Sequence, residues 1–188
     1  MTSAPAADRT GDPFTGSAAF YRQLVDSLPA AVYTTDREGR IALYNDAAVE
    51  LWGRRPEPGE QWCGSGRIFR PDGSALALDQ CPMAVALREG RAVEGVEVIV
   101  ERPDGTRRNV LPSPRLLLDD SGVVIGAVNM LLDITSRRHA ERALRESETI
   151  LREVADTAPV MIWMSGLDKG RYWFNKRWLD FVGRPMEH

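Results

Sequence analysis

The stretch VVIGAVNMLLD, residues 123–133, is followed after two residues by SRRHAERALRESETILREVADTA, residues 136–158, and this pair of segments decides the fold. The first segment is rich in β-branched and apolar residues, and only Gly126 and Asn129 interrupt it, which predicts a buried strand. The second segment has no Gly or Pro and is dense in Arg, Glu, Ala and Leu, which predicts a long helix. Because the strand runs almost directly into the helix, a disturbance of the strand can reach the helix.

The joint between the two segments consists of Asp133, Ile134 and Thr135. Thr135 or Ser136 is a suitable N-cap, because a hydroxyl can accept a hydrogen bond from an N–H group of the first helical turn. We expect Asp133 and Thr135 to satisfy backbone groups where the strand becomes a helix. We therefore predict that these three joint residues couple the strand to the helix.

The long helix has an apolar stripe with regular spacing. Its members are four, three, four, three and four positions apart: Ala140, Leu144, Ser147, Leu151, Val154 and Ala158. This alternation is typical of the a and d positions of a coiled coil. The stripe either packs on the domain of its own chain or forms the seam of a parallel dimer. We favour the dimer, because so polar a helix between two domains has little else to bury.

Composition and charge exclude several function classes. The 188 residues are 43% hydrophobic and 27% charged, as in an ordinary globular protein, and the net charge of −3 offers no general attraction to nucleic acid or an anionic membrane. The sequence has neither an apolar run that could span a bilayer nor a secretory signal pattern, so we expect a cytoplasmic protein. Cys63 and Cys81 form no CxxC motif, and we expect free thiols.

The order of the elements predicts an α+β fold: a five-stranded antiparallel sheet with helices on one face, followed by the long linker helix. Residues 1–16 have little to bury and are expected to be disordered. Turn residues between 56 and 81 predict a small extra hairpin or an ordered loop. Pro112 and Pro114 restrict their strand to an edge or a bulged path. The other predicted helices cover residues 17–28, 46–52 and 82–89, and the predicted strands cover 31–36, 40–44, 93–102, 106–118 and 123–133.

A second copy of the domain start lies 130 residues further along the chain. Without a gap, the shift aligns six identical pairs: Arg22 with Arg152, Asp26 with Asp156, Pro29 with Pro159, Asn45 with Asn175, Gly53 with Gly183, and Arg54 with Arg184. A constant shift through a helix, a hairpin and a second helix indicates a duplication. The second copy, residues 159–188, lacks the three closing strands, so we expect a fragment of a longer tandem protein or a truncated gene product.

Three segments carry a resemblance to a known family. They are SLPAAVYTTDREGRIALYNDAAVELWG at residues 27–53, ERPDGTRR at 101–108 and GAVNMLLDITSRRHAERAL at 126–144. They resemble a PAS domain of a bacterial sensor protein of the histidine-kinase type, and the last is the most specific, because PAS domains commonly end in a D-I-T segment before a signalling helix. The resemblance covers one whole domain at residues 17–135 and the start of another at 151–188. We therefore expect a PAS domain at 17–135, a linker helix at 136–158 and a partial second domain at 159–188.

The resemblance implies a sensory module. Such a domain reads a small ligand, a cofactor or a partner between sheet and helices, and relays it through the exit helix to an output such as a histidine kinase. The cysteine-bearing helix of light-sensing flavin members is absent, and no His lies between Asn45 and Gly90 to bind haem. Flavin and haem are therefore not supported, and the cofactor stays unassigned. Kinase motifs are missing too, so we predict no enzyme activity for this chain.

Asn129 is the strongest candidate for a ligand contact, because it is a lone amide in an apolar strand. An unsatisfied buried amide costs about 1–3 kcal/mol, so its partner is either a ligand or a group of the fold. Asn109 and Ser113, on the preceding strand, are weaker candidates of the same kind. Four further residues either line an apolar pocket or pack in the core: Tyr33, Trp52, Met83 and Leu87.

Cysteine and histidine offer little chemistry. Cys81 precedes a helix that Pro82 opens, a place where thiol pKa values fall, so it is either a thiol sensor or a passive thiol. Cys63, Cys81 and His139 lack the spacing of metal ligands, and we expect no metal site. His139 is expected to be a solvated surface residue, because no kinase motif surrounds it.

Two functions from different classes remain open. In the first, a sensor domain dimerises, reads an input and passes a change in helix register or rotation to a downstream kinase or other effector. In the second, the same fold has a filled core, binds no small molecule and only brings chains together. A small molecule that co-purifies would favour the first. An enzyme has little support, because no nucleophile–base pair, metal cluster or phosphate loop stands out.

Overall fold

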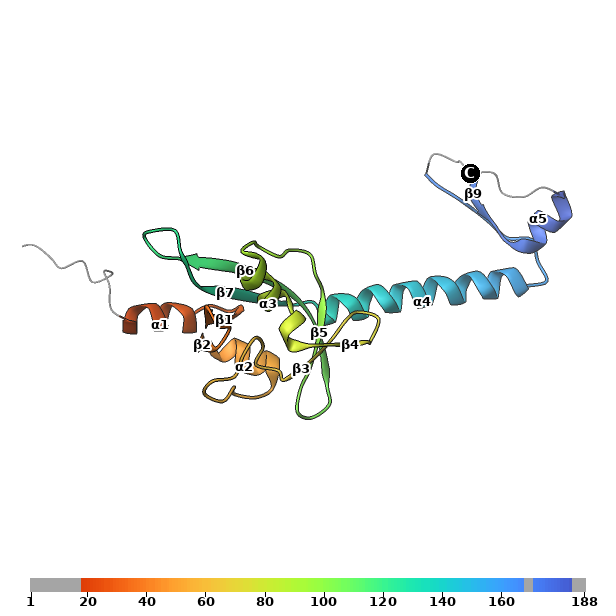
Figure 1. Ribbon diagram of the computed structural model, residues 1–188. Coiled ribbons are helices and arrows are strands. Elements are labelled where there is room, and N and C mark those ends of the chain that lie inside the picture. Colours follow the sequence, from red (N-terminus) through yellow and green to blue (C-terminus); the bar gives the residue numbers. More distant parts are fainter. Residues whose placement is uncertain (1–17, 168–170, 184–188) are drawn as a thin grey trace, which may run out of the picture. The chain divides into compact units, whose positions relative to one another are not determined.

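Seven antiparallel strands form one sheet in the order β2-β1-β7-β6-β5-β3-β4, and β8 and β9 form a separate pair (Figure 1). The computed structural model describes residues 18–167 and 171–183, so the predicted lead-in at residues 1–16 lies outside the described residues. The chain divides into two units between Thr135 and Ser136. The strands are β1 (Ala31–Asp36), β2 (Ile41–Tyr44), β3 (Arg67–Phe69), β4 (Ala75–Leu76), β5 (Val98–Glu101), β6 (Arg107–Leu118), β7 (Val124–Asp133), β8 (Trp163–Ser165) and β9 (Arg171–Phe174). The helices are α1 (Ala18–Asp26), α2 (Asp46–Trp52), the short 3-10 turn η1 (Leu78–Gln80), α3 (Pro82–Glu89), α4 (Thr135–Thr157) and α5 (Lys176–Val182).

The hairpin of β6 and β7 is the centre of the sheet (Figure 1). Side chains alternate along β7: Ala127, Asn129 and Leu131 are buried in the core, whereas Met130 and Leu132 are about half exposed on the other face. The strand predicted from the β-branched and apolar run is therefore present, and its one buried amide belongs to the core face.

Pro112 and Pro114 lie inside β6 without breaking it. β5 pairs with β6 only as far as Val110, so both prolines lie where β7 is the remaining described neighbour of β6. A proline has no N–H group to offer to a ladder, and a free edge tolerates it for that reason. The predicted edge placement therefore holds for the part of the strand beyond Val110.

The sheet has seven strands and not the five predicted, because β3 and β4 extend it. Ile68 of β3 pairs with Leu76 of β4 on one side and with Val100 of β5 on the other. Ile68 and Phe69 are buried, so the segment that predicted an extra hairpin or an ordered loop forms a hairpin that joins the main sheet. An alternation of apolar residues over only three positions is too short to predict a strand of the sheet.

The strand predicted over residues 93–102 is shorter in the structure. Only Val98–Glu101 forms β5, although valine and glutamate alternate from Val93 onward. Gly95 has a φ of 72°, which interrupts an extended backbone. Residues 93–97 therefore form a loop, although valine and glutamate alternate there.

Helices α2 and α3 close the core against the sheet, since α2 contacts β1, and α3 contacts β6 and β7. Asn45 caps α2, and Gly53 ends it with a left-handed φ of 71°. Trp52, at the end of α2, is fully buried and packs edge-on against Tyr33 with 5.2 Å between ring centroids. Gly64 makes room for this indole, because a Cβ there would lie 2.4 Å from the ring. The α+β class with an antiparallel sheet and packed helices is thus confirmed.

The second unit repeats the start of the first. β8 pairs with β9 as β1 pairs with β2, and α5 follows as α2 does. Asn45 and Asn175 are both buried, and each binds two N–H groups and at least two carbonyl groups of its own unit. Asn45 also binds the Leu28 carbonyl, and its four contacts that recur in the second unit are to Val25, Ala30, Val32 and Ala48. The groups around Asn175 belong to Ala155, Val160, Ile162 and Trp178.

All four partners are 130 residues apart between the units, so the repeat in the sequence is also a repeat of contacts. Val25 lies in α1 and Ala155 lies in α4. The last turns of α4 therefore occupy, in the second unit, the place that α1 has in the first. Within the described ranges, none of the helices combines the length and the apolar content that crossing a bilayer requires.

Candidate functional site

Tyr33 of β1 and Asn129 of β7 meet in the middle of the core. Tyr33 Oη donates a hydrogen bond to the carbonyl of Trp62 at 2.7 Å and accepts one from Asn129 Nδ2 at 3.2 Å. Burial raises the pKa of Tyr33 well above its ordinary value, so the phenol keeps the proton that it donates. Asn129 Oδ1 accepts a bond from the backbone N–H of Ser113 at 2.9 Å. Groups of the fold therefore satisfy both ends of the Asn129 amide.

A cavity of about 20 Å³ lies beside these groups, lined by Tyr33, Met83 and Asn129 among others. Because a single water molecule needs about 10–15 Å³, this space admits about one water and no larger ligand. Trp52 and Leu87, the other predicted pocket residues, belong to the core: Trp52 is buried, and Leu87 is partly buried against the core cluster. The indole Nε1 of Trp52 has no hydrogen-bond partner within the described part of the chain.

The side chains of Asn109 and Ser113 lie outside the lining of this cavity, which differs from their predicted place. Val110 and Pro112 line it, and neighbouring residues of a strand point to opposite faces. Asn109 Nδ2 instead donates to Glu97 Oε1 at 2.9 Å. The contact of Ser113 with the core amide is made by its backbone N–H, which donates to Asn129 Oδ1.

The joint between β7 and α4 is held by β6. The Ile134 N–H donates to the Asn109 carbonyl at 2.9 Å, and the Asn109 N–H donates to Thr135 Oγ1, also at 2.9 Å. The Thr135 N–H donates to Asp133 Oδ1 at 2.8 Å. Arg108 lies 3.9 Å from the other oxygen of Asp133. Both polar joint side chains thus satisfy backbone N–H groups, and a single residue separates β7 from α4.

Comparison with known proteins identifies the fold that this geometry belongs to. The family model described as the PAS fold matches residues 25–139, more than half of the chain. The chain belongs to the PAS-fold family. The matched range includes the end of α1, all seven strands of the main sheet and the first residues of α4.

Relatives of this PAS protein include proteins named as sensors. Sensor protein TdiS of Thauera aromatica is 27% identical and aligns over 66% of this chain and 23% of its own length. Two-component sensor PprA of Pseudomonas aeruginosa is 25% identical over 88% of this chain and 18% of its own length. The PAS domain of the fruit-fly ELK potassium channel, 16% identical, matches with a TM-score of 0.51 over 64% of this chain and 99% of that one, which shows a shared fold. The chain spans about a fifth of the length of the curated relatives it matches.

The two thiols of the PAS domain are buried and line the same core cavity. Cys81 caps α3, and its Sγ accepts a bond from the Ala84 N–H at 3.4 Å, which favours the thiolate. Burial outweighs this and raises the pKa of Cys81 to about 12, and burial also raises the pKa of Cys63. A thiol sensor at Cys81 is therefore disfavoured. Within residues 18–167 and 171–183, no three His, Cys, Asp or Glu side chains gather as metal ligands would.

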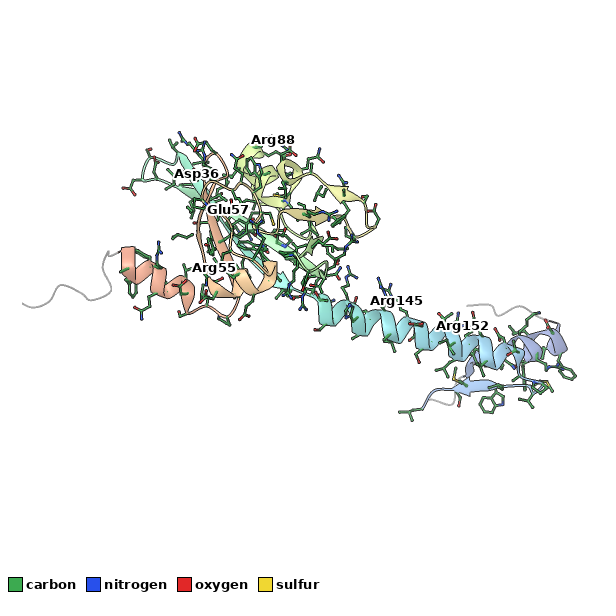
Figure 2. The ribbon with its side chains drawn as sticks, turned by 90° about the horizontal axis from the view of Figure 1, so that it is seen from below. Asp36, Arg55, Glu57, Arg88, Arg145 and Arg152 are labelled. Atoms are coloured by element: carbon green, nitrogen blue, oxygen red, sulfur yellow. The ribbon has the colours of Figure 1, made fainter. Side chains whose placement is uncertain are left out.

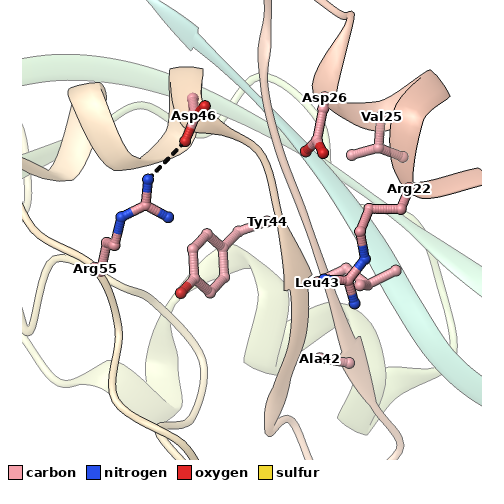
Figure 3. Close-up of a pocket in the computed structure, with 8 residues that line it drawn as sticks. All are labelled: Arg22, Val25, Asp26, Ala42, Leu43, Tyr44, Asp46 and Arg55. Atoms are coloured by element: carbon pink, nitrogen blue, oxygen red, sulfur yellow. Dashed lines mark hydrogen bonds and ion pairs between the residues drawn. The ribbon is translucent and has the colours of Figure 1, made fainter. Parts of the chain in front are cut away.

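A second hollow, of about 310 Å³, lies between α1, β2 and α2 (Figure 3). Its walls include Arg22 and Asp26 of α1, Tyr44 of β2, and an ion pair in which Arg55 donates to Asp46 Oδ1 at 2.8 Å. Arg55 and Asp46 are 66% and 79% exposed, so water screens their pairing and it contributes little to stability. Sequence patterns did not predict this hollow, because its walls come from three elements that only the fold brings together.

The predicted seam of α4 is exposed. Leu144, Leu151 and Val154 are 61%, 66% and 61% exposed, and Ala140 and Ser147 are exposed as well. Figure 2 shows Arg145 and Arg152 projecting from the same helix, next to seam positions. The carbonyl of Trp62, which accepts the Tyr33 hydrogen bond, is a contact that no sequence pattern predicted.

Proposed function

We propose that this PAS domain is a sensory module that relays a change in its core through α4 to a downstream effector, such as a histidine kinase. The names of the relatives TdiS and PprA support a sensor. The relay rests mainly on one observation, the hydrogen bonds between Asn109 of β6 and the two residues that join β7 to α4.

These bonds connect the core to the helix along one strand. Ser113 of β6 binds Asn129, the buried amide beside Tyr33. Four residues earlier on β6, Asn109 binds Thr135, the first residue of α4. A shift of β6 that follows a change at Asn129 therefore alters the hydrogen bonds on which α4 begins.

The alternative is a ligand-free interaction module, and one observation favours it. The core cavity of about 20 Å³ holds no ligand larger than about one water without rearrangement. In the sensor proposal, the input is therefore a partner or a ligand that opens the core. Native mass spectrometry of the purified chain separates the two: a stoichiometric bound molecule supports ligand sensing, and the bare protein mass supports the interaction module.

We also propose that the exposed stripe of α4 is the seam of a parallel homodimer, and that residues 159–188 begin a second PAS domain. Leu144, Leu151 and Val154 offer an apolar surface at a and d spacing. The contacts of Asn175, which repeat those of Asn45, support the second domain. A change in packing of this short, imperfect seam is a suitable output, because near-equal packings are shifted by small free energies.

Hydrogen exchange of the full chain tests the relay. Asn129→Ala leaves Tyr33 Oη and the Ser113 N–H without their partner, and we expect faster exchange of the amides at residues 134–140. The control is Ile68→Ala, which truncates a buried side chain of β3, a strand that pairs with β4 and β5 and makes no hydrogen bond to Asn129 or Asn109. The exchange rates of the two variants are compared under conditions in which their free energies of unfolding are equal. If both variants accelerate residues 134–140 equally, or neither does, the relay is refuted.

A further inference from the structure

Another hollow, of about 430 Å³, lies at the end of β7 beside the joint, and it shares only Leu131 with the lining of the core cavity. We call it the joint hollow. Its walls come from the start of β1, from α2, β6 and β7, and from Arg102, which follows β5. Its charged lining residues are Glu50, Arg102, Arg108 and Asp133. Small-molecule sites have volumes of about 300–1,000 Å³, so this hollow has the size of one.

The guanidinium of Arg108 has hydrogen-bonding capacity that the fold leaves unused. Its Nε is buried and has no partner within residues 18–167 and 171–183. Its Nη1 lies 3.9 Å from Asp133 Oδ2, which is too far for a hydrogen bond. A buried donor without an acceptor is unusual in a folded protein. The wall of the joint hollow thus carries a cation that is ready for an acceptor from outside the chain.

Arg102 adds a second guanidinium to the same wall. It donates from Nε to the Leu51 carbonyl at 3.1 Å and from Nη2 to the Glu50 carbonyl, both in the last turn of α2. These acceptors carry no formal charge, so they fix the guanidinium without neutralising it. The Glu50 carboxylate is exposed to water, which screens its charge. The joint hollow therefore offers two cations near the loosely held carboxylate of Asp133.

The chemistry of this wall suits an acid that has an apolar body. A carboxylate accepts two parallel N–H groups of a guanidinium, which gives a directed, charge-assisted contact. Pro29, Leu51 and Leu131 supply apolar surface in the same hollow, against which an alkyl chain leaves water. Neither a bare inorganic anion nor an uncharged hydrocarbon uses both parts of the lining.

We propose that the joint hollow binds a small monocarboxylate with an apolar body, whose carboxylate contacts Arg108 beside Arg102. The bound acid competes with Asp133 for Arg108. Asp133 Oδ1 accepts the Thr135 N–H, and the Asn109 N–H next to Arg108 donates to Thr135, so the ligand lies against the hydrogen bonds on which α4 begins. Binding stands on its own, whereas its effect on α4 rests on the proposed relay.

Chemical-shift titration of the isotope-labelled full chain tests the binding with three probes. Sodium hexanoate has both the charge and the apolar body, hexanamide lacks the charge, and sodium acetate lacks the body. We expect hexanoate to shift the amides of residues 29–31 and 131–133 saturably, and the other two probes to bind about tenfold more weakly or worse. Acetate that binds as tightly as hexanoate would reveal an adventitious anion only. No saturable shift up to about 20 mM hexanoate overturns the site.

Arg108→Gln removes the charge from the wall and tests the assigned residue. Because the fold makes no hydrogen bond to the Arg108 Nε, the variant is expected to fold, which circular dichroism checks. Hexanoate should bind it about tenfold more weakly or worse. Arg115→Gln is the matched control, since it removes the same charge from β6 at an exposed position that pairs with Glu94 outside the joint hollow. Equal weakening in the two variants would mean general electrostatic attraction and overturns the site.

Hydrogen exchange separates the site from the relay. With saturating hexanoate we expect faster exchange of the amides at residues 134–140, because a second carboxylate beside Asp133 weakens its attraction to Arg108. Hexanoate that binds through Arg108 without altering this exchange supports the site and refutes the relay. If hexanoate does not bind, while Asn129→Ala still accelerates residues 134–140, the site is overturned and the relay stands.

Discussion

The hydroxyl of Thr135 accepts a hydrogen bond from the backbone N–H of Asn109 at 2.9 Å, and the two residues are 26 positions apart. Thr135 is buried, is the first residue of α4, and donates its own N–H to Asp133 Oδ1. The helix therefore starts on a residue that is bonded to both central strands. In the proposed relay, a displacement of β6 against β7 acts on this residue through these two hydrogen bonds.

Thr135→Val should destabilise the first unit, because the isosteric side chain leaves the Asn109 N–H without an acceptor. We expect a loss of about 1–2 kcal/mol in the free energy of unfolding, measured by urea denaturation. Thr135→Ser keeps the hydroxyl and should retain most of the stability. Equal losses in the two variants would mean that the methyl group, and not the hydrogen bond, matters there.

Asp133→Ala should loosen the joint and lower the melting temperature. Its carboxylate accepts the Thr135 N–H at 2.8 Å, in the manner of a helix cap. Loss of such a cap costs about 0.5–2 kcal/mol. Asp133→Asn, which retains an acceptor oxygen, is the matched control. An unchanged melting temperature for Asp133→Ala would show that this side chain contributes nothing to the joint.

Asn45→Ala and Asn175→Ala should have the same local effect in different units. Each removes an amide that binds at least four backbone groups, so the segments it joins should open more often. Hydrogen exchange should increase in β1 and β2 for Asn45→Ala, and in β8 and β9 for Asn175→Ala. An Asn175→Ala chain with unaltered exchange in β8 and β9 would argue against an equivalent role for the two asparagines.

The buried thiol of Cys81 predicts a pH dependence of stability. The pKa of Cys81 is raised from 9.0 to about 12 in the folded chain, so the folded state keeps a proton that the unfolded state releases. The contribution of this buried thiol to the free energy of unfolding is complete below pH 9. It is lost as the pH rises from about 9 towards about 12. The stability difference between wild type and Cys81→Ala should therefore shrink above pH 9, by at most about 1.4 kcal/mol per pH unit. A difference that is constant from pH 8 to pH 10.5 would contradict this.

Leu144→Glu should abolish or strongly weaken self-association, because it places a charge in the apolar seam of α4. Leu144 is 61% exposed within the single chain, so the substitution should spare the fold. Thr149→Glu adds the same charge away from the seam and serves as the control. Sedimentation velocity reports the result, and a monomeric wild type at all accessible concentrations would refute the seam.

Local patterns in the sequence were informative wherever one element carries its own pattern. The run over residues 123–133 predicts β7, the Arg- and Glu-rich segment predicts α4, and the 130-residue shift identifies Asn175 as the equivalent of Asn45. The prediction of strands failed where the alternation of residues was short or interrupted. Thus β3 and β4 cover only three and two residues, and Gly95 interrupts the alternation of valine and glutamate before β5.

The amino-acid sequence was sufficient to predict the α+β class, the strand-to-helix joint and the PAS family, and it contains the 130-residue repeat of identities. Only the tertiary structure decided which groups meet. Asn129 binds Tyr33 across 96 residues, whereas the Asn109 N–H binds Thr135 and the Asn109 side chain binds Glu97. The physical reason is that periodicity assigns a residue to a face of its own element, whereas the partner on that face depends on strand order and register. Those are set by the packing of the whole core, and they determine that groups of two neighbouring strands satisfy the Asn129 amide, a choice that the sequence left open.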